Sequence, residues 1–378
     1  MNLKKIKLYF MLGFVFINIL PQYVITIDNN LKELKIDFEN KLIKIPAWMK
    51  KQISNDFLGV AVETFNITPK VLNHYNNMPA IRITINEGEL SVHRSNWFQH
   101  NKWQSWAEVR ALCMIKGFNM LNSITVLPDA DFLVYLWDCF GPYNPGSPSF
   151  FPILGPAKDR KLNNNVILIP DFHFVEIYPK LISEVEEANE LYPWSEKFNK
   201  AIWRGASNGV KYDLSESRHV RLKLVETASL MPELIDAKFN HVGQGGNIRP
   251  YLMKFTGNRV SIRNHIKFKY QLAIDGNGPS YPGTYWRQFA NCAVIKNISD
   301  GIQWYYEALQ PYEHYIPVKS DFTDLKDKII WCQDHDEELQ KIAANTNNFA
   351  KNNLQLVDNL LYVYLVIKEI SYRQIKDS

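Results

Sequence analysis

Asp138 is placed in this 378-residue sequence where a general base would be useful. It follows the apolar run from residue 132 to 137 and precedes a loop rich in Gly and Pro, so its carboxylate is expected at the tip of a strand. A carboxylate at a strand tip can accept a proton from a bound hydroxyl group, or it can cap the loop.

The segment after residue 203 carries arginines and small residues that suit a diphosphate. Arg204 and Gly205 stand at a predicted strand end, and Ser207 lies in the small-residue turn that follows. Backbone N–H groups at the start of a following helix favour phosphate, and an arginine fork can hold a diphosphate without a metal. Arg218 and Arg221 lie three residues apart in the next helical run, on one face. Taken alone, an Arg-Gly pair at a strand end also fits a plain surface turn.

A third polar group, Asp275-Gly276-Asn277-Gly278, ends the predicted strand at residues 268–274. Ligands of open α/β sheets bind at the carboxyl ends of strands, which makes this group a candidate for donor binding. Asp-Gly and Asn-Gly are also common turn dipeptides, so a tight turn is the alternative.

Asp129 and Asp131 form an Asp-x-Asp pattern, which can hold a divalent cation on a diphosphate. Pro128 precedes the pair and a strand follows at once, so we interpret the pattern as a β-turn and keep a metal site as the alternative. The four cysteines lie far apart, without a Cys-x-x-Cys pair or a histidine at metal-ligand spacing, which argues against a zinc site.

Strands alternate with helices along the chain, which predicts βα units and mainly parallel sheets. Helices are expected at residues 106–121, 181–191 and 216–230, and strands at 124–127, 132–137, 165–169, 201–203, 234–239 and 268–274. The last segment, residues 334–370, is expected to be helical with an interruption near 345–348, and to pack across both domains.

Composition excludes one class of function and suggests a compartment. The net charge is only +4 and the basic residues are dispersed, so no nucleic-acid partner is expected. Three lysines precede an apolar run from Leu8 to Leu20, which predicts a signal peptide or membrane anchor within residues 1–25. The protein is then secretory or membrane-associated, with an N-terminal membrane contact; it is cytoplasmic if the run belongs to the core.

Taken in order, these segments resemble glycosyltransferase family 90, which includes Rumi-like protein O-glucosyltransferases, capsule-associated xylosyltransferases and lipopolysaccharide-modifying relatives. The resemblance runs from about Pro128 to Asn352. It is carried by Ala201-Ile-Trp-Arg-Gly205, Phe268-Lys-Tyr270, Asp275-Gly-Asn-Gly278, Trp304-Tyr-Tyr306, Leu309–Val318 and Asp321–Leu325.

The resemblance implies a GT-B-like α/β fold, with two Rossmann-like domains facing across a cleft. We therefore expect an acceptor-side domain at 26–195, a nucleotide-sugar domain at 196–340 and crossover helices at 341–378. It also implies inverting, metal-independent transfer of glucose or xylose from a UDP-sugar to a hydroxyl of a glycan, lipopolysaccharide or protein. No cofactor is expected, because the UDP-sugar is a co-substrate.

The family's residue roles map onto this sequence one by one. Asp138 matches the catalytic aspartate, Arg204 the arginine near the diphosphate, and Arg218 the downstream arginine. A further arginine of the animal enzymes aligns with Gly283, and Arg287 could replace it if that stretch is helical. The alternatives are a degenerate sugar- or nucleotide-binding protein of the same fold, and a metal-dependent enzyme that uses Asp129 and Asp131.

Overall fold

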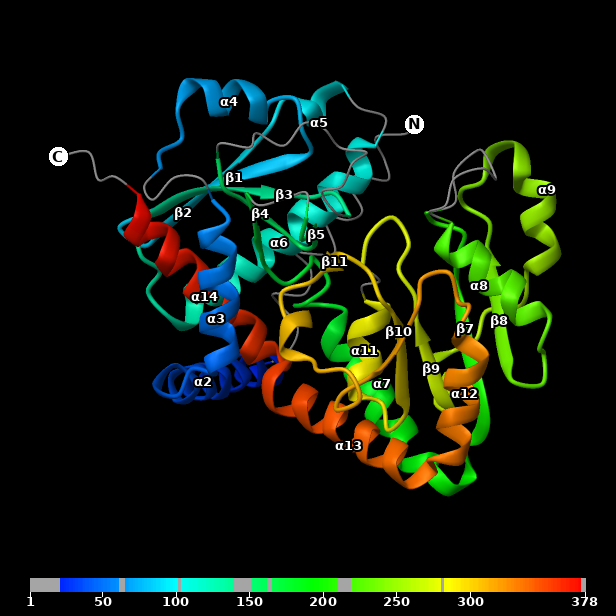
Figure 1. Cartoon of the computed structure of the whole chain (residues 1–378). Helices are drawn as coiled ribbons and strands as arrows, with labels where there is room; N and C mark the ends of the chain where they lie inside the picture. The colour runs from blue at the N-terminus through cyan, green and yellow to red at the C-terminus, as the bar shows by residue number, and fades with distance from the viewer. Residues whose placement is uncertain are drawn as a thin grey trace.

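The computed structural model describes residues 21–60, 65–100, 103–138, 151–161, 165–209, 219–279 and 282–374 (Figure 1). Residues 1–20, which carry most of the predicted signal peptide or anchor, lie outside these ranges, as does Arg218. Over the ranges that are described, no helix combines the length and apolar character needed to cross a membrane.

The first half of the chain builds a mixed five-stranded sheet in the order β2-β1-β3-β4-β6. Its strands are β1 (Ala80–Asn86), β2 (Glu89–Arg94), β3 (Ala130–Tyr135), β4 (Ile153–Gly155) and β6 (Val166–Leu168). Its helices are α2 (Pro21–Ile43), α3 (Ala47–Leu58), α4 (Pro69–Tyr75), α5 (Trp97–His100) and α6 (Gln104–Ile124). Strands β3, β4 and β6 are parallel, so their carboxyl ends meet at one edge.

Mainly parallel sheets were expected and are found, with an antiparallel exception at one side of the first sheet. Strand β1 pairs antiparallel with both β2 and β3. The β1–β2 hairpin turns at Glu87 and Gly88, whose φ angles are 51° and 81°. Positive φ at both central residues matches the twist of a two-residue hairpin, and Gly adopts it without strain.

The second half forms a parallel five-stranded sheet in the order β12-β10-β9-β7-β8. Its strands are β7 (Phe198–Ala206), β8 (Ile235–His241), β9 (Phe268–Ala273), β10 (Ala293–Asn297) and β12 (Ile316–Val318). Its helices are α7 (Tyr178–Leu191), α8 (Val220–Ser229), α9 (Arg249–Leu252), α10 (Ile262–His265), α11 (Gly283–Phe289) and α12 (Leu325–Asp334). The chain places β8 on one side of β7 and β9 on the other, so the strand order reverses between β7 and β9.

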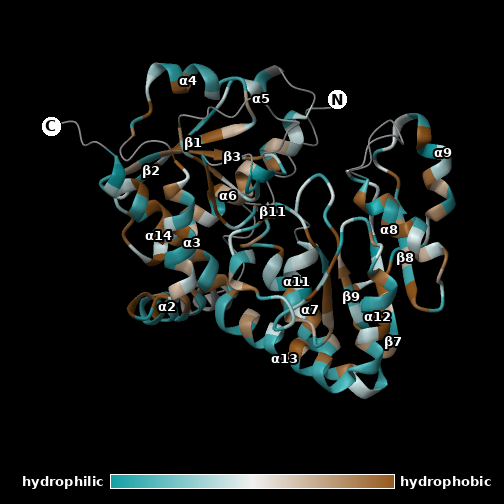
Figure 2. Cartoon of the chain, viewed as in Figure 1, coloured by the Kyte–Doolittle hydropathy of each residue, from teal (hydrophilic) through white to brown (hydrophobic). Residues whose placement is uncertain are grey.

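The two halves are joined by packing as well as by the chain. A small antiparallel sheet pairs β5 (Lys158–Asp159) with β11 (Gly301–Ile302). One buried core cluster contains the first sheet together with Tyr285 and Phe289 of α11 and Trp304, while a second lies within the parallel sheet and its outer helices. In Figure 2 the hydrophobic colour concentrates in the strands, and the outer helix α13 (Asp336–Asn353) is largely hydrophilic. The α/β, GT-B-like expectation is confirmed; the domain boundaries remain a prediction.

The C-terminal helices cross both halves, as expected. Helix α13 contacts α11 and β10, and α14 (Leu356–Arg373) contacts α2, α3 and β3 (Figure 1). The interruption expected near 345–348 is wrong, because the break lies at Leu354 and Gln355. Inside α13, buried Thr346 and Asn347 donate to the carbonyl oxygens of His314 and Phe289, so these polar residues bind neighbouring elements and the helix continues.

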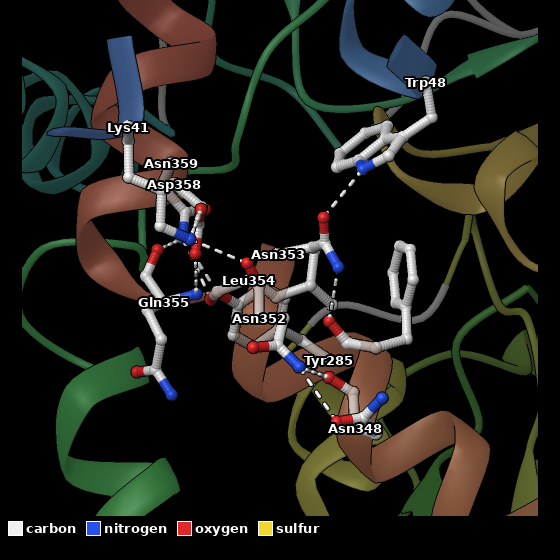
Figure 3. A network of polar contacts seen from close by, with 11 residues as sticks. Lys41, Trp48, Tyr285, Asn348, Asn352, Asn353, Leu354, Gln355, Asp358 and Asn359 are labelled. Carbon is white, nitrogen blue, oxygen red and sulfur yellow. Dashed lines mark hydrogen bonds and ion pairs between the residues drawn. The ribbon is translucent and has the colours of Figure 1, made fainter. Parts of the chain in front are cut away.

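A polar network holds the α13–α14 junction (Figure 3). Gln355 and Asp358 form a capping box at the start of α14. Lys41 of α2 pairs with the fully buried Asp358 at 2.5 Å, and both Tyr285 and Asn359 donate to the carbonyl oxygen of Leu354. The junction is therefore tied to helices of both halves.

The strand expected at residues 124–127 is wrong. Helix α6 extends through Ile124, whose side chain is buried in the same core as Leu121, and Thr125 caps the helix in an extended conformation. A short apolar run has no periodicity that separates a strand from the last turn of a buried helix.

Candidate functional site

The carboxyl edge of the first sheet meets that of the second at Asp138. This residue follows β3, and its Oδ2 accepts a 3.4 Å hydrogen bond from Nδ2 of Asn277. Asn277 lies in the loop after β9, at the strand-order reversal of the second sheet. Ligands of doubly wound sheets bind at such a reversal, so Asp138 faces the expected ligand position from the opposite half.

Arg221 occupies the reversal itself. It lies in the first turn of α8, and its guanidinium donates to the carbonyl oxygens of Ala206, Ile274 and Asp275 at 3.0 to 3.2 Å, bridging the ends of β7 and β9. Burial lowers the pKa of Arg221 to about 10, and the carboxylates of Asp275 and Asp138 partly oppose this effect. These three hydrogen bonds go to neutral carbonyls, so the cation is well suited to attract an anion.

Glycines let the two loops approach Arg221. A Cβ on Gly276 would lie 2.7 Å from Cζ of Arg221. Gly209 has a φ of +86°, and a Cβ there would lie 2.9 Å from backbone atoms of Gly276. The close packing of the loops after β7 and β9 therefore requires the absence of side chains at both positions.

Ser207 fixes the loop after β7 and does not point a free hydroxyl at the ligand position. It is fully buried, its Oγ donates to the carbonyl oxygen of Gln244 at 2.6 Å, and it accepts from the N–H of Gln244 at 3.1 Å. Gly205 lies under the ring of Trp203, where a Cβ would come within 2.4 Å of that ring. Both residues support the shape of the site.

The guanidinium of Arg204 binds other groups of the protein, on the side of the edge strand β8. Its guanidinium pairs with Asp236 at 2.7 Å and donates to the carbonyl oxygens of Trp203, Asp236 and Asn258 at 2.8 to 3.2 Å. These bonds tie β7 to β8 and to the loop at Asn258. The expected contact of Arg204 with a diphosphate stays a prediction, and the structure gives this arginine a bridging role in the sheet.

Two buried polar atoms near the reversal lack partners. Oδ1 of Asp275 and Nε of Arg287 have no hydrogen-bond partner within the described parts of the chain. Arg287 lies in α11, so this stretch is helical, which was the condition for Arg287 to replace an arginine at Gly283, and burial lowers its pKa to about 9. Buried polar atoms without partners are rare in native proteins, and such atoms beside a ligand position can be satisfied by the ligand or by water.

Arg110 holds the other oxygen of the Asp138 carboxylate. Nη2 of Arg110 lies 2.6 Å from Oδ1 of Asp138, and Nη1 donates to the carbonyl oxygen of Leu136 at 2.8 Å. The Asp138 side chain is 29% exposed, so it stands at the boundary between the core and the space above the sheet edge.

The alternative metal pair lies at the amino end of β3, away from Asp138. Asp131 pairs with Arg82 through both oxygens, at 2.5 and 2.8 Å, and Asp129 accepts from the N–H of Glu87 at 2.7 Å. Asp131 lies within β3 and Asp129 just before it, so the β-turn expected at this pair is wrong, although both carboxylates have structural partners. In the described part of the chain, no three Cys, His, Asp or Glu residues are placed to hold a metal together.

The structure thus brings Asp138, Asp275, Gly276 and Asn277 close to one another, with Arg221 beside them. Ser207 and Gly205 shape the neighbouring loop after β7, while the guanidinium of Arg204 points toward Asp236 of β8. The role expected of Arg218 falls outside the described residues. Arg221 was visible in the sequence as the partner of Arg218 on one helix face, whereas nothing local singled out Arg110.

Curated relatives are similar to this chain over about two thirds of its length. Protein O-glucosyltransferase 2 of Danio rerio is 28% identical over 66% of this chain and 48% of its own. Protein O-glucosyltransferase 3 of Homo sapiens is 27% identical over 67% and 49%. The alignments span about half the length of these relatives.

Solved structures are similar at lower identity. A glycosyltransferase from Rickettsia africae ESF-5 is 14% identical over 71% of this chain and 82% of that one, with a TM-score of 0.36. Anabaena HepE in complex with UDP and glucose is 12% identical over 54% and 57%, with a TM-score of 0.32. The model of glycosyl transferase family 90 matches residues 47–376, which is most of the sequence, and the chain therefore belongs to that family.

Proposed function

We propose that this chain is an inverting, metal-independent glycosyltransferase that moves glucose or xylose from a UDP-sugar to a hydroxyl of a glycan, lipopolysaccharide or protein. The observation that supports it best is the 3.4 Å contact between Asp138 and Asn277, which sets a carboxylate opposite the strand-order reversal. The names of the relatives favour glucose as the sugar and a protein as the acceptor.

In this proposal Asp138 takes the proton of the acceptor hydroxyl. The acceptor oxygen then forms a bond to the anomeric carbon from the face opposite UDP, and the bond between that carbon and the diphosphate breaks. The electron pair leaves with UDP, so the configuration at the anomeric carbon inverts. A carboxylate within hydrogen-bond reach of the hydroxyl is the requirement for this step.

Arg221 and the first turn of α8 would stabilise the charge that develops on the leaving diphosphate. The side chain is already fixed by three carbonyl oxygens, so little reorganisation is needed when the charge forms. Oδ1 of Asp275 has no hydrogen-bond partner among the described residues, and it would accept a hydrogen bond from a hydroxyl group of the UDP-sugar. Arg287, in α11, would add a second cation on the donor side.

The test is release of UDP from a panel of UDP-sugars, with and without EDTA, by wild type and Asp138→Asn. Release that persists in EDTA and is lost in the variant supports the proposal and identifies the donor. Loss with EDTA in wild type would favour the metal-dependent alternative. A folded wild type that releases no UDP from any donor would favour a sugar- or nucleotide-binding protein.

A further inference from the structure

Arg110 is held more rigidly than an ordinary ion-pair partner. Its Cζ lies 3.4 Å from the ring centroid of Trp106 and 4.0 Å from that of Phe172. With the hydrogen bonds to Leu136 and Asp138, the guanidinium is fixed both in its plane and on its faces. Arginine stacks on aromatic rings and binds carboxylates in a defined geometry, which lysine does not reproduce.

The groups that fix Arg110 come from three separate elements. Trp106 lies one turn before Arg110 on α6, Phe172 lies in the loop after β6, and Leu136 lies between β3 and Asp138. Trp106 also packs edge-on against Trp137, the neighbour of Asp138, with ring centroids 5.0 Å apart. Any movement of the guanidinium would disturb the backbone as well as the side chain of the Asp138 segment.

We infer that Arg110 is a positioning residue for Asp138: it holds Oδ1 and so turns Oδ2 toward Asn277 and the donor side. This inference rests on the proposed function, because it assigns Oδ2 as the oxygen that takes the acceptor proton. The 2.6 Å contact at Oδ1 and the 3.4 Å contact at Oδ2 divide the carboxylate into a held oxygen and a facing oxygen.

A comparable ion pair lies at the other end of the same strand. Arg82 binds both oxygens of Asp131 near the start of β3, so that pair joins strands and leaves neither carboxylate oxygen directed across to the second half. Arg82→Ala therefore removes an arginine–carboxylate contact of β3 without touching Asp138. It is the matched control for Arg110→Ala.

The experiment compares both variants in steady-state turnover, with and without added guanidinium ion. Arg110→Ala is expected to lower kcat on the order of 10- to 100-fold, because a misplaced base loses the reactive geometry. The KM for the UDP-sugar should stay within about twofold, since the described contacts of Arg110 all lie in the first half of the chain, and millimolar guanidinium should restore part of kcat by entering the vacated space. Arg82→Ala should keep its kcat and show no response to guanidinium.

The outcomes separate this inference from the proposed function. If Asp138→Asn is inactive while Arg110→Ala turns over at the wild-type rate, the inference is overturned and the proposed function stands. Full turnover by Asp138→Asn would instead remove the base itself. A crystal structure of Arg110→Ala tests the inference independently of any activity assay. A carboxylate of Asp138 displaced from Asn277 supports the inference, and an unmoved carboxylate overturns it.

Discussion

Asn277 donates a 3.4 Å hydrogen bond to Asp138, and this contact joins the loop after β9 to the end of β3. The two residues follow strands of different sheets, so the contact connects the two halves of the chain at this point. Arg221, whose pKa is affected by both Asp138 and Asp275, lies beside the same contact. The reactive groups of the proposed site thus converge where the two halves meet.

Asp138→Asn is expected to abolish transfer while leaving folding and donor binding intact. The amide keeps the size of the carboxylate and one of its two accepting oxygens, but it does not take up the proton of the acceptor hydroxyl, and loss of general base catalysis costs about 100- to 10,000-fold. UDP binding measured by calorimetry and turnover measured by UDP release check the two halves of this expectation.

Asp131→Asn is the matched control, because it changes a carboxylate on the same strand that faces away from the site. Its bidentate pair with Arg82 is about a quarter exposed on both sides, with side-chain exposures of 29% and 26%, so the variant should lose some stability while it keeps its turnover. Turnover lost in Asp131→Asn as severely as in Asp138→Asn would contradict the assignment of the base.

Arg221→Gln should weaken UDP binding more than Arg204→Gln. The first change removes the cation that bridges the ends of β7 and β9, and a charge-assisted contact to a diphosphate is worth about 1.5–3 kcal/mol, or about 10- to 100-fold in Kd. The second change leaves Asp236 without its 2.7 Å partner and should mainly lower the Tm. Titration of UDP against both variants checks this expectation. A greater loss of affinity in Arg204→Gln would support Arg204 as the residue that binds the diphosphate.

The sequence predicted β7, β8 and β9 of the second sheet, because their signals are local, and it missed β10 and β12. β9 is a run of buried residues ending in Asp-Gly-Asn-Gly, and β7 ends in a small-residue turn. The β1–β2 hairpin and the end of α6 were missed or misplaced, since Glu87 carries no hairpin signal and Ile124 belongs to an apolar run that fits either element. Burial of Ile124 in the core and the pairing of β1 with β2 and β3 determine these structures, and neither is visible in the local sequence.

The site was predictable only where a strand tip marked a residue. Asp138 and Asp275 were found this way, but Arg110 binds Asp138, 28 residues away, and Arg221 binds the carbonyl oxygen of Asp275, 54 residues away. Their placement depends on helix packing, which no spacing in the sequence reveals. The pairing of Arg204 with Asp236 of the neighbouring strand was not predictable for the same reason.

Gly276→Ala should lower donor affinity with a modest effect on folding. The new Cβ would stand 2.7 Å from Cζ of Arg221, which is held by three carbonyl oxygens and must shift. Gly209→Ala meets backbone atoms at 2.9 Å and has a positive φ, so it should instead destabilise the fold by roughly 1 kcal/mol or more. Urea unfolding and UDP titration of both variants separate the two effects; equal UDP affinity in Gly276→Ala and wild type would contradict the first.

Lys41→Met should destabilise the α13–α14 junction shown in Figure 3. Asp358 is fully buried, and burial raises its pKa even though Lys41 opposes this, so loss of the 2.5 Å partner leaves an uncompensated carboxylate. Breaking such a pair costs about 3–5 kcal/mol when both groups are buried, and less here because Lys41 is 29% exposed. The double variant Lys41→Met/Asp358→Asn should recover part of the loss in urea unfolding; no recovery would contradict a charge effect.

His265 should make the protein sensitive to mild acid. The ring is buried beside Gln271, with Arg287, Arg204 and Asp236 also acting on it, and burial lowers its pKa from 6.5 to about 3. Below pH 6.5 His265 binds a proton in the unfolded chain but not in the folded chain. The free energy of unfolding therefore falls as the pH falls from 6.5 toward 3. Between pH 7 and 5.5 this amounts to about 1 kcal/mol. Urea unfolding at both pH values should show that difference between wild type and His265→Gln; an equal loss in both proteins would mean that His265 is not the group responsible.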